Sequence, residues 1–122
     1  DWQPLSEQAI ALALAQNKRV FVDVTADWCI TCKANKFNVL LRDDVQQALS
    51  APDVVALRGD WSRPSNTIAS FLRQRGSVAI PFNQIYGPGL TDGEILSPLL
   101  DRSTLLATLA QAGIAPSQGE NK

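Results

Sequence analysis

The sequence contains no histidine and no methionine, and it has only two cysteines among its 122 residues. The absence of histidine excludes Cys–His and Ser–His catalysis and removes a main ligand of zinc sites. The absence of both residues also weakens the case for copper binding, because imidazole and thioether groups are ligands that copper favours. Any chemistry must therefore come from Cys, Asp, Glu, Lys, Arg or Tyr side chains.

Long apolar runs and an excess of one charge are missing as well. No stretch approaches the roughly 18 to 20 consecutive apolar residues of a membrane span, and no basic-then-apolar segment opens the chain. Eleven basic residues against twelve acidic ones leave a net charge of −1. This balance excludes the electrostatic footprint of a nucleic-acid or anionic-membrane partner. We expect a domain that does not itself insert into a membrane.

The residues that are present describe one ordinary globular domain. Apolar residues make up 45% of the chain and charged residues 19%, which is too apolar for a disordered protein. A chain of this length buries about two-thirds of its unfolded surface and needs no structural staple. We expect one domain over residues 1–115, followed by a polar, disordered tail over residues 116–122.

Apolar patterning, caps and turn residues predict alternating helices and strands. Helices are expected at residues 6–16, from 30 onward, 43–49, 65–75 and 103–112, and strands at 20–25, 54–57, 80–86 and 94–96, with 2–3 as a candidate for one more short strand. The strand at 20–25 is almost continuously apolar, as in a central strand covered on both faces. This order predicts an α/β fold in three layers, with a central mixed sheet flanked by helices.

The two cysteines, Cys29 and Cys32, lie where the apolar strand turns into a helix. Unpaired N–H groups at a helix N-terminus favour an anion, so the Cys29 thiolate should be stabilised at the exposed lip of the helix. Cys32 lies within one turn and can resolve a mixed disulfide. The alternatives are half of a zinc site or two unrelated buried thiols, but a zinc site would need two more Cys or His ligands. We interpret the pair as a redox-active disulfide that needs no further cofactor and no metal.

Asp23 lies in the same strand, on the face shared with Phe21 and Thr25 by the period of two. Burial there would raise the pKa of its carboxyl group and let it accept the proton of the Cys32 thiol. The alternative is a partly exposed aspartate at a strand end without a role.

Other residues near the cysteines carry weaker signals. Trp28 could cover the disulfide and shape a docking surface, although edge packing explains an indole there nearly as well. Lys33 and Arg58 could add positive potential, or could be solvated surface charges. Pro81 follows Ile80 at the start of a strand, and without further context an X-Pro bond is expected to be trans.

The segment VFVDVTADWCITCK resembles the active-site segment of the thioredoxin superfamily, with strand, aspartate, Trp-Cys-x-x-Cys-Lys and helix in register. The likeness extends over about residues 5–112. ADWCITCKANK, GDWS and GSVAIPFNQIYGPG with EILSPLL resemble the C-terminal domain of the DsbD family of membrane thiol reductases. IPFNQIYGPG is most similar to the ScsB branch, which is linked to suppression of copper sensitivity.

The resemblance implies a thioredoxin-like, periplasmic domain behind a membrane-embedded electron carrier of the same inner-membrane protein. The domain would take electrons from that carrier and pass them to the N-terminal periplasmic domain. Cys29 would be the nucleophile, Cys32 the resolving cysteine and Asp23 the buried acid. Pro81 would be a cis-proline opposite the pair, and Trp28, Ile80 and Pro81 would bind the partner, with the Ile80 backbone pairing with an incoming extended segment.

One position departs from the resemblance. Seven residues after Cys29, where the DsbD domain carries a second acid, this chain has Lys36. A positive charge there would favour a thiolate, so a scheme in which two carboxylates tune the pKa of the thiol is in doubt for this chain. Two other functions stay open: a free-standing general disulfide reductase, and a module that holds copper or a protein through the dithiol without turnover. A buried proton acceptor such as Asp23 argues against the second of these.

Overall fold

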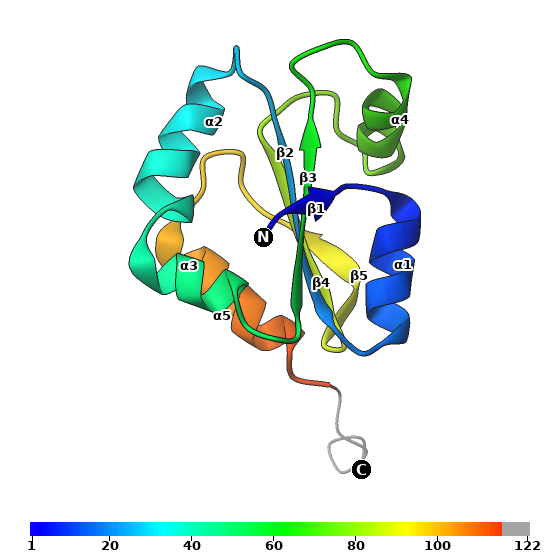
Figure 1. Cartoon of the computed structure of the whole chain (residues 1–122), viewed down its shortest axis with the longest axis vertical. Helices are drawn as coiled ribbons and strands as arrows, with labels where there is room; N and C mark the ends of the chain where they lie inside the picture. Colours follow the sequence, from blue (N-terminus) through cyan, green and yellow to red (C-terminus); the bar gives the residue numbers. More distant parts are fainter. Residues whose placement is uncertain (116–122) are drawn as a thin grey trace.

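The computed structural model describes residues 1–115. Figure 1 shows three layers, with a central sheet between helices α2, α3 and α5 on one side and α1 and α4 on the other. The elements in chain order are β1 (Gln3–Pro4), α1 (Glu7–Ala15), β2 (Arg19–Thr25), α2 (Ile30–Asn35), the π-helical turn η1 (Lys36–Leu40), α3 (Asp43–Leu49), β3 (Val54–Asp60), α4 (Asn66–Gln74), β4 (Phe82–Gly87), β5 (Leu90–Ile95) and α5 (Arg102–Ala112). The predicted tail at 116–122 lies outside the described residues.

The sheet has five strands in the order β1-β3-β2-β4-β5. Strand β2 pairs in parallel with β3 and antiparallel with β4, and β5 continues antiparallel to β4. β2 is therefore the middle strand with a helical layer on each face, which accounts for its nearly continuous apolar sequence. The predicted three-layer α/β fold with a mixed sheet is confirmed.

Alternation along β2 divides the core into two clusters. Val20, Val22 and Val24 face α1 and α4 and pack in one buried cluster. Phe21 belongs to the other cluster, together with residues of η1, α3 and α5. Asp23 follows Phe21 by two residues, so its side chain lies on the face covered by α2 and η1, as the alternation predicts.

Local signals set most helix ends. The Ser6 hydroxyl accepts the Ala9 N–H at 2.9 Å and begins α1, and the Asp101 carboxylate accepts the Thr104 N–H at 2.9 Å and begins α5. Gly76 ends α4 with a φ of 74°, and the N–H of Ser77 then bonds to the Leu72 carbonyl at 2.9 Å. This left-handed position suits glycine, as its predicted capping role requires.

Several parts of the fold differ from the sequence-based prediction. Strand β1 covers Gln3–Pro4 rather than 2–3, β3 continues to Asp60 rather than ending at 57, and β4 begins at Phe82 rather than at 80. The last strand runs over Leu90–Ile95 rather than 94–96, because it is an edge strand whose Thr91 and Asp92 face solvent. Such polar edge residues resemble a loop in sequence. The helix after Cys32 also widens into the π-helical turn η1, whose hydrogen-bond pattern leaves no mark in residue composition.

Candidate functional site

The site is centred on a disulfide between Cys29 and Cys32, whose Cα atoms are 5.2 Å apart. Cys29 is the N-cap residue of α2, with an extended backbone, and its Sγ accepts the N–H of Cys32 at 3.1 Å. The N-terminus of α2 therefore already directs a donor at the Cys29 sulfur. An ionised sulfur at this position would be stabilised by the same donor and by the helix dipole.

Apolar side chains cover the disulfide. Cys29, Cys32 and Ala26 form a small buried cluster, and Trp61 and Ile80 pack against it. Both cysteines are 6% exposed, so the expected difference in exposure is absent in this oxidised form. The capping position, rather than exposure, is what distinguishes Cys29 here.

Asp23, in β2, is buried and only 4% exposed. Both Nε and Nη2 of Arg58 approach its Oδ2 at 2.9 Å, and Nδ2 of Asn83 donates to its Oδ1 at 2.8 Å. Burial raises the pKa of the Asp23 carboxyl group, while the Arg58 charge and the Asn83 hydrogen bond act in the opposite direction. The predicted burial of Asp23 is confirmed, and its role in proton transfer stays a prediction.

Asp23 and Cys32 line the same cavity, which has a volume of about 360 Å³. Lys36, the residue that departs from the DsbD pattern, also lines this cavity, as do Lys33 and Arg58. Three cationic side chains therefore line the cavity, together with the carboxyl groups of Asp23, Asp27 and Asp60. The expectation that a positive Lys36 favours the thiolate stays a prediction.

The predicted partner-binding residues lie beside the disulfide. The Ile80–Pro81 peptide bond is cis, as the family resemblance implies. Trp28 is 60% exposed, and its Nε1 donates to the Trp61 carbonyl at 3.2 Å. Trp28, Trp61, Val78 and Ile80 line a groove of about 520 Å³, whereas Pro81 is buried and lines a neighbouring cavity. The structure thus gathers Trp28 and Ile80 in one groove, and Pro81 does not line that groove.

Sequence reasoning missed Asn83 and Trp61 and did not pair Arg58 with Asp23. Asn83 is 1% exposed and lies in β4 beside a second buried amide, Gln84. The polar pair interrupts the alternation of the strand, so composition gave no sign that Asn83 faces Asp23. The pairing of Arg58 with Asp23 depends on the β2–β3 register, in which the two residues are direct neighbours.

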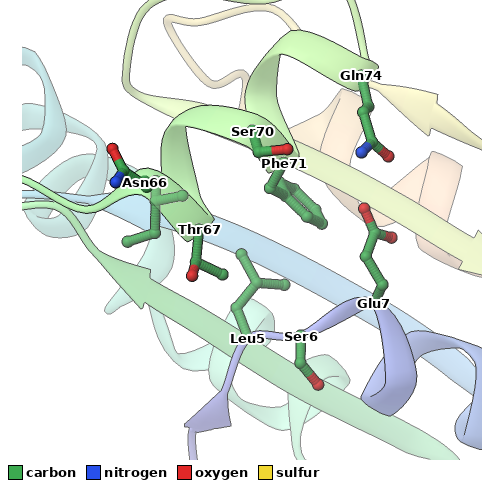
Figure 2. Close-up of a pocket in the computed structure, with 9 residues that line it drawn as sticks. Leu5, Ser6, Glu7, Asn66, Thr67, Ser70, Phe71 and Gln74 are labelled. Atoms are coloured by element: carbon green, nitrogen blue, oxygen red, sulfur yellow. The ribbon is translucent and has the colours of Figure 1, made fainter.

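Another cavity, of about 430 Å³, lies between the start of α1 and helix α4. Figure 2 shows Leu5 and Phe71 pointing into this space, with Glu7 near its edge. The Ser6 hydroxyl is used as a helix cap, and the Glu7 carboxylate is bound by Arg75 at 2.7 Å. These two polar groups therefore already have hydrogen-bond partners within the fold.

Neither a metal cluster nor a membrane span appears in residues 1–115. In that part of the chain, His, Cys, Asp and Glu side chains do not gather in threes as metal ligands would. Within the same residues, every helix is too short or too polar to cross a bilayer. The disulfide as the sole redox group stays a prediction.

Fold and site together define a thioredoxin-like domain with a Cys-x-x-Cys disulfide. The Thioredoxin-like family model matches residues 1–88, and the chain belongs to this family.

Two curated relatives are the thiol:disulfide interchange proteins DsbD of Yersinia enterocolitica and Klebsiella pneumoniae. They are 32% identical over 77 residues and 34% identical over 71 residues, which covers 63% and 58% of this chain. The chain spans only 13% and 12% of the length of these relatives.

Solved structures show the same fold. The oxidised C-terminal domain of DsbD from Neisseria meningitidis superposes with a TM-score of 0.67 at 22% identity, covering 87% of this chain and 91% of that one. A thioredoxin from Thermus thermophilus gives a TM-score of 0.66 at 24% identity, covering 90% of this chain and 84% of that one. The chain is thus a thioredoxin-like disulfide oxidoreductase domain related to DsbD.

Proposed function

We propose that this domain relays electrons from a membrane-embedded carrier to a periplasmic partner domain of the same inner-membrane protein. The observation that carries the proposal is the Cys29–Cys32 disulfide at the start of α2, with Cys32 and the buried Asp23 lining one cavity. The similarity to DsbD supports a tethered domain. The IPFNQIYGPG segment supports the ScsB branch and, through it, a contribution to copper tolerance.

The chemistry is two successive thiol–disulfide exchanges. The Cys29 thiolate attacks one sulfur of the partner disulfide, forms a mixed disulfide and releases the other partner sulfur as a thiolate. Cys32 then loses its proton to Asp23, and its thiolate attacks Cys29. The second partner sulfur leaves with the electron pair of the broken bond. The partner gains two electrons, and the domain is left with the Cys29–Cys32 disulfide, which the donor dithiol reduces again.

The partner docks on the groove beside the disulfide. Trp28 and Val78 are 60% and 82% exposed there, and exposed apolar side chains around a redox centre suit a small, dissociable interface. The backbone of Ile80, just before the cis-proline Pro81, pairs with an extended segment of the partner.

A trapping experiment tests the relay. In a Cys32→Ala variant, Cys29 can attack a partner but no thiol resolves the mixed disulfide, so the partner stays attached. In a periplasmic extract that contains the other domains of the full-length protein, the N-terminal domain should dominate the trapped species. The Cys29→Ala variant is the matched control and should trap little. A broad set of unrelated proteins without enrichment of that domain would support the general reductase instead.

A second experiment tests which cysteine is the nucleophile. After reduction, Cys29 should react first with limiting iodoacetamide near neutral pH, because its sulfur is at the N-terminus of α2. Mass mapping of the alkylated peptides measures the order. Faster modification of Cys32 would show that the assignment is wrong.

A further inference from the structure

Two buried amide side chains follow one another in β4. Asn83 is 1% exposed and Gln84 is 3% exposed, and successive strand residues face opposite sides of the sheet. Gln84 faces α1 and α4, where its Oε1 accepts hydrogen bonds from Arg75 Nε and the Tyr86 hydroxyl, both at 2.9 Å. Asn83 lies directly opposite Asp23 in the β2–β4 pairing and faces the cysteine side.

Only the nitrogen of the Asn83 side-chain amide has hydrogen-bond partners in residues 1–115. Its Nδ2 donates to Asp23 Oδ1 at 2.8 Å and to the Val22 carbonyl at 3.2 Å. Its Oδ1 is buried, and no donor in residues 1–115 reaches it. An unpaired buried amide oxygen destabilises a fold, and an apolar β-branched residue would suit this strand better. Strand stability therefore does not explain an asparagine at this position.

Arg58 and Asn83 divide the Asp23 carboxyl group between them. Arg58 bonds only to Oδ2, through two nitrogens, and Asn83 bonds only to Oδ1. Two partners on different oxygens hold the plane of the carboxyl group, whereas Arg58 alone would leave it free to rotate about the contact at Oδ2. Asn83 thus restricts the orientation of the group that shares a cavity with Cys32.

We propose that Asn83 is a positioning residue for the resolving step: it holds the Asp23 carboxylate in the orientation that accepts the proton of the Cys32 thiol. This inference rests on the proposed proton transfer to Asp23. In that step the Cys32 S–H bond breaks and its proton passes to Asp23. The Cys32 thiolate then bonds to Cys29 Sγ, and the partner sulfur leaves as a thiolate with the bonding electron pair.

Loss of the Asn83 amide should change the ionisation of Asp23 as well as its orientation. Burial raises the pKa of Asp23, and the hydrogen bond from the Asn83 amide lowers it. Removal of the amide should therefore raise the pKa of Asp23 further. Five other charged groups line the same cavity. They are Asp27 in the loop after β2, Lys33 in α2, Lys36 in η1, and Arg58 and Asp60 in β3. All of these remain in an Asn83 variant, so a change in pH dependence would report on the amide.

The test compares Asn83→Leu with Gln84→Leu, which removes the neighbouring buried amide from the other face. Reduced protein is mixed with excess Ellman's reagent, and release of thionitrobenzoate is followed by stopped flow. The first release reports attack by Cys29. The second is unimolecular and reports attack by Cys32. We expect Asn83→Leu to slow the second phase about tenfold at pH 7 and to shift its pH profile to higher pH, while Gln84→Leu leaves both unchanged.

Two further variants separate the inference from the function on which it rests. If Asp23→Asn leaves the second phase unchanged, the proposed role of Asp23 is wrong. If Asp23→Asn slows the phase but Asn83→Leu does not, only the inference about Asn83 fails. In a double variant that combines Asp23→Asn with Asn83→Leu, the second substitution should not slow the phase further, because Asn83 acts through Asp23. Full additivity would overturn the inference. Should Asn83→Leu not fold, Asn83→Thr lacks the same amide and carries the same expectation.

Discussion

The two faces of the sheet each carry a cluster of one arginine, one carboxylate and one buried amide. On the face of α1 and α4 the members are Arg75, Glu7 and Gln84, and on the face of α2 and η1 they are Arg58, Asp23 and Asn83. Each arginine also lies over an aromatic ring, Arg75 at 3.5 Å from the Phe71 centroid and Arg58 at 3.8 Å from that of Trp2. Similar parts therefore occur at two sites, of which one adjoins the cysteines.

Exposure of the carboxylate separates the two clusters. The Glu7 side chain is 51% exposed and takes two hydrogen bonds from Arg75 at 2.7 Å, and its pKa is lowered chiefly by these bonds. The Asp23 side chain is only 6% exposed, and burial raises its pKa despite Arg58. An arginine beside an acid thus does not determine its ionisation alone. Access to water makes one cluster a surface ion pair, whereas burial in the other raises the pKa of the carboxyl group.

The largest difference between the two clusters is expected when each carboxylate is neutralised in turn. Asp23→Asn should slow the resolving step about a hundredfold, because a positioned proton acceptor is removed. Glu7→Gln, its matched control on the other face, should leave the rate unchanged. Stopped-flow measurement of the second exchange phase at pH 7 gives both rates. Equal rates for Asp23→Asn and the unmodified protein would make Asp23 a purely structural residue.

The same pair of variants should show opposite dependences of stability on pH. A raised pKa means that folded Asp23 keeps its proton when the unfolded residue, with a pKa of about 3.9, has lost it. Its contribution is therefore fully present below that value and is lost as pH rises through the folded pKa. Glu7 has a lowered pKa, so its contribution is present above about pH 4.3 and is lost as pH falls through the folded value.

Urea denaturation between pH 3 and pH 8 measures this difference. Relative to the unmodified protein, Asp23→Asn should become more stable as pH rises, and at neutral pH its stability should be equal or higher. Glu7→Gln should become relatively less stable over the same range, by less than about 1 kcal/mol because the pair is half exposed. Parallel curves for the two variants would show that the clusters do not differ in the way that burial implies.

The sequence alone identified the parts of the site that depend on local order. The apolar run before Cys29 identified β2, the alternation along it placed Asp23 on the buried face, and the turn into a helix placed Cys29 at an N-cap. The family resemblance supplied the cis bond before Pro81. Each of these features is determined by residues within a few positions of one another or by a short motif.

Features that depend on the register between distant strands could not be predicted. Arg58 and Asn83 meet Asp23 from positions 35 and 60 residues away in sequence. A shift of one residue in either strand would turn these side chains to the other face. From the sequence, Arg58 could be either a source of positive potential or a solvated surface charge, and only the pairing of β2 with β3 and β4 brings Arg58 and Asn83 to Asp23.

The smallest effect is expected from a substitution of Lys36, which lines the cavity shared by Asp23 and Cys32. Lys36→Glu would place a carboxylate in the cavity shared by Asp23 and Cys32, and a negative charge there raises the pKa of both groups. We expect the resolving step at pH 7 to slow by about threefold, a modest change because Lys36 is exposed and its charge is screened by water and salt. Lys18→Glu makes the same change in net charge next to the opposite end of β2 and should have no effect. Stopped-flow rates at low and high salt measure the difference, which should shrink as salt is added. An equal effect from Lys18→Glu would mean that net charge, rather than the local field of the cavity, sets the rate.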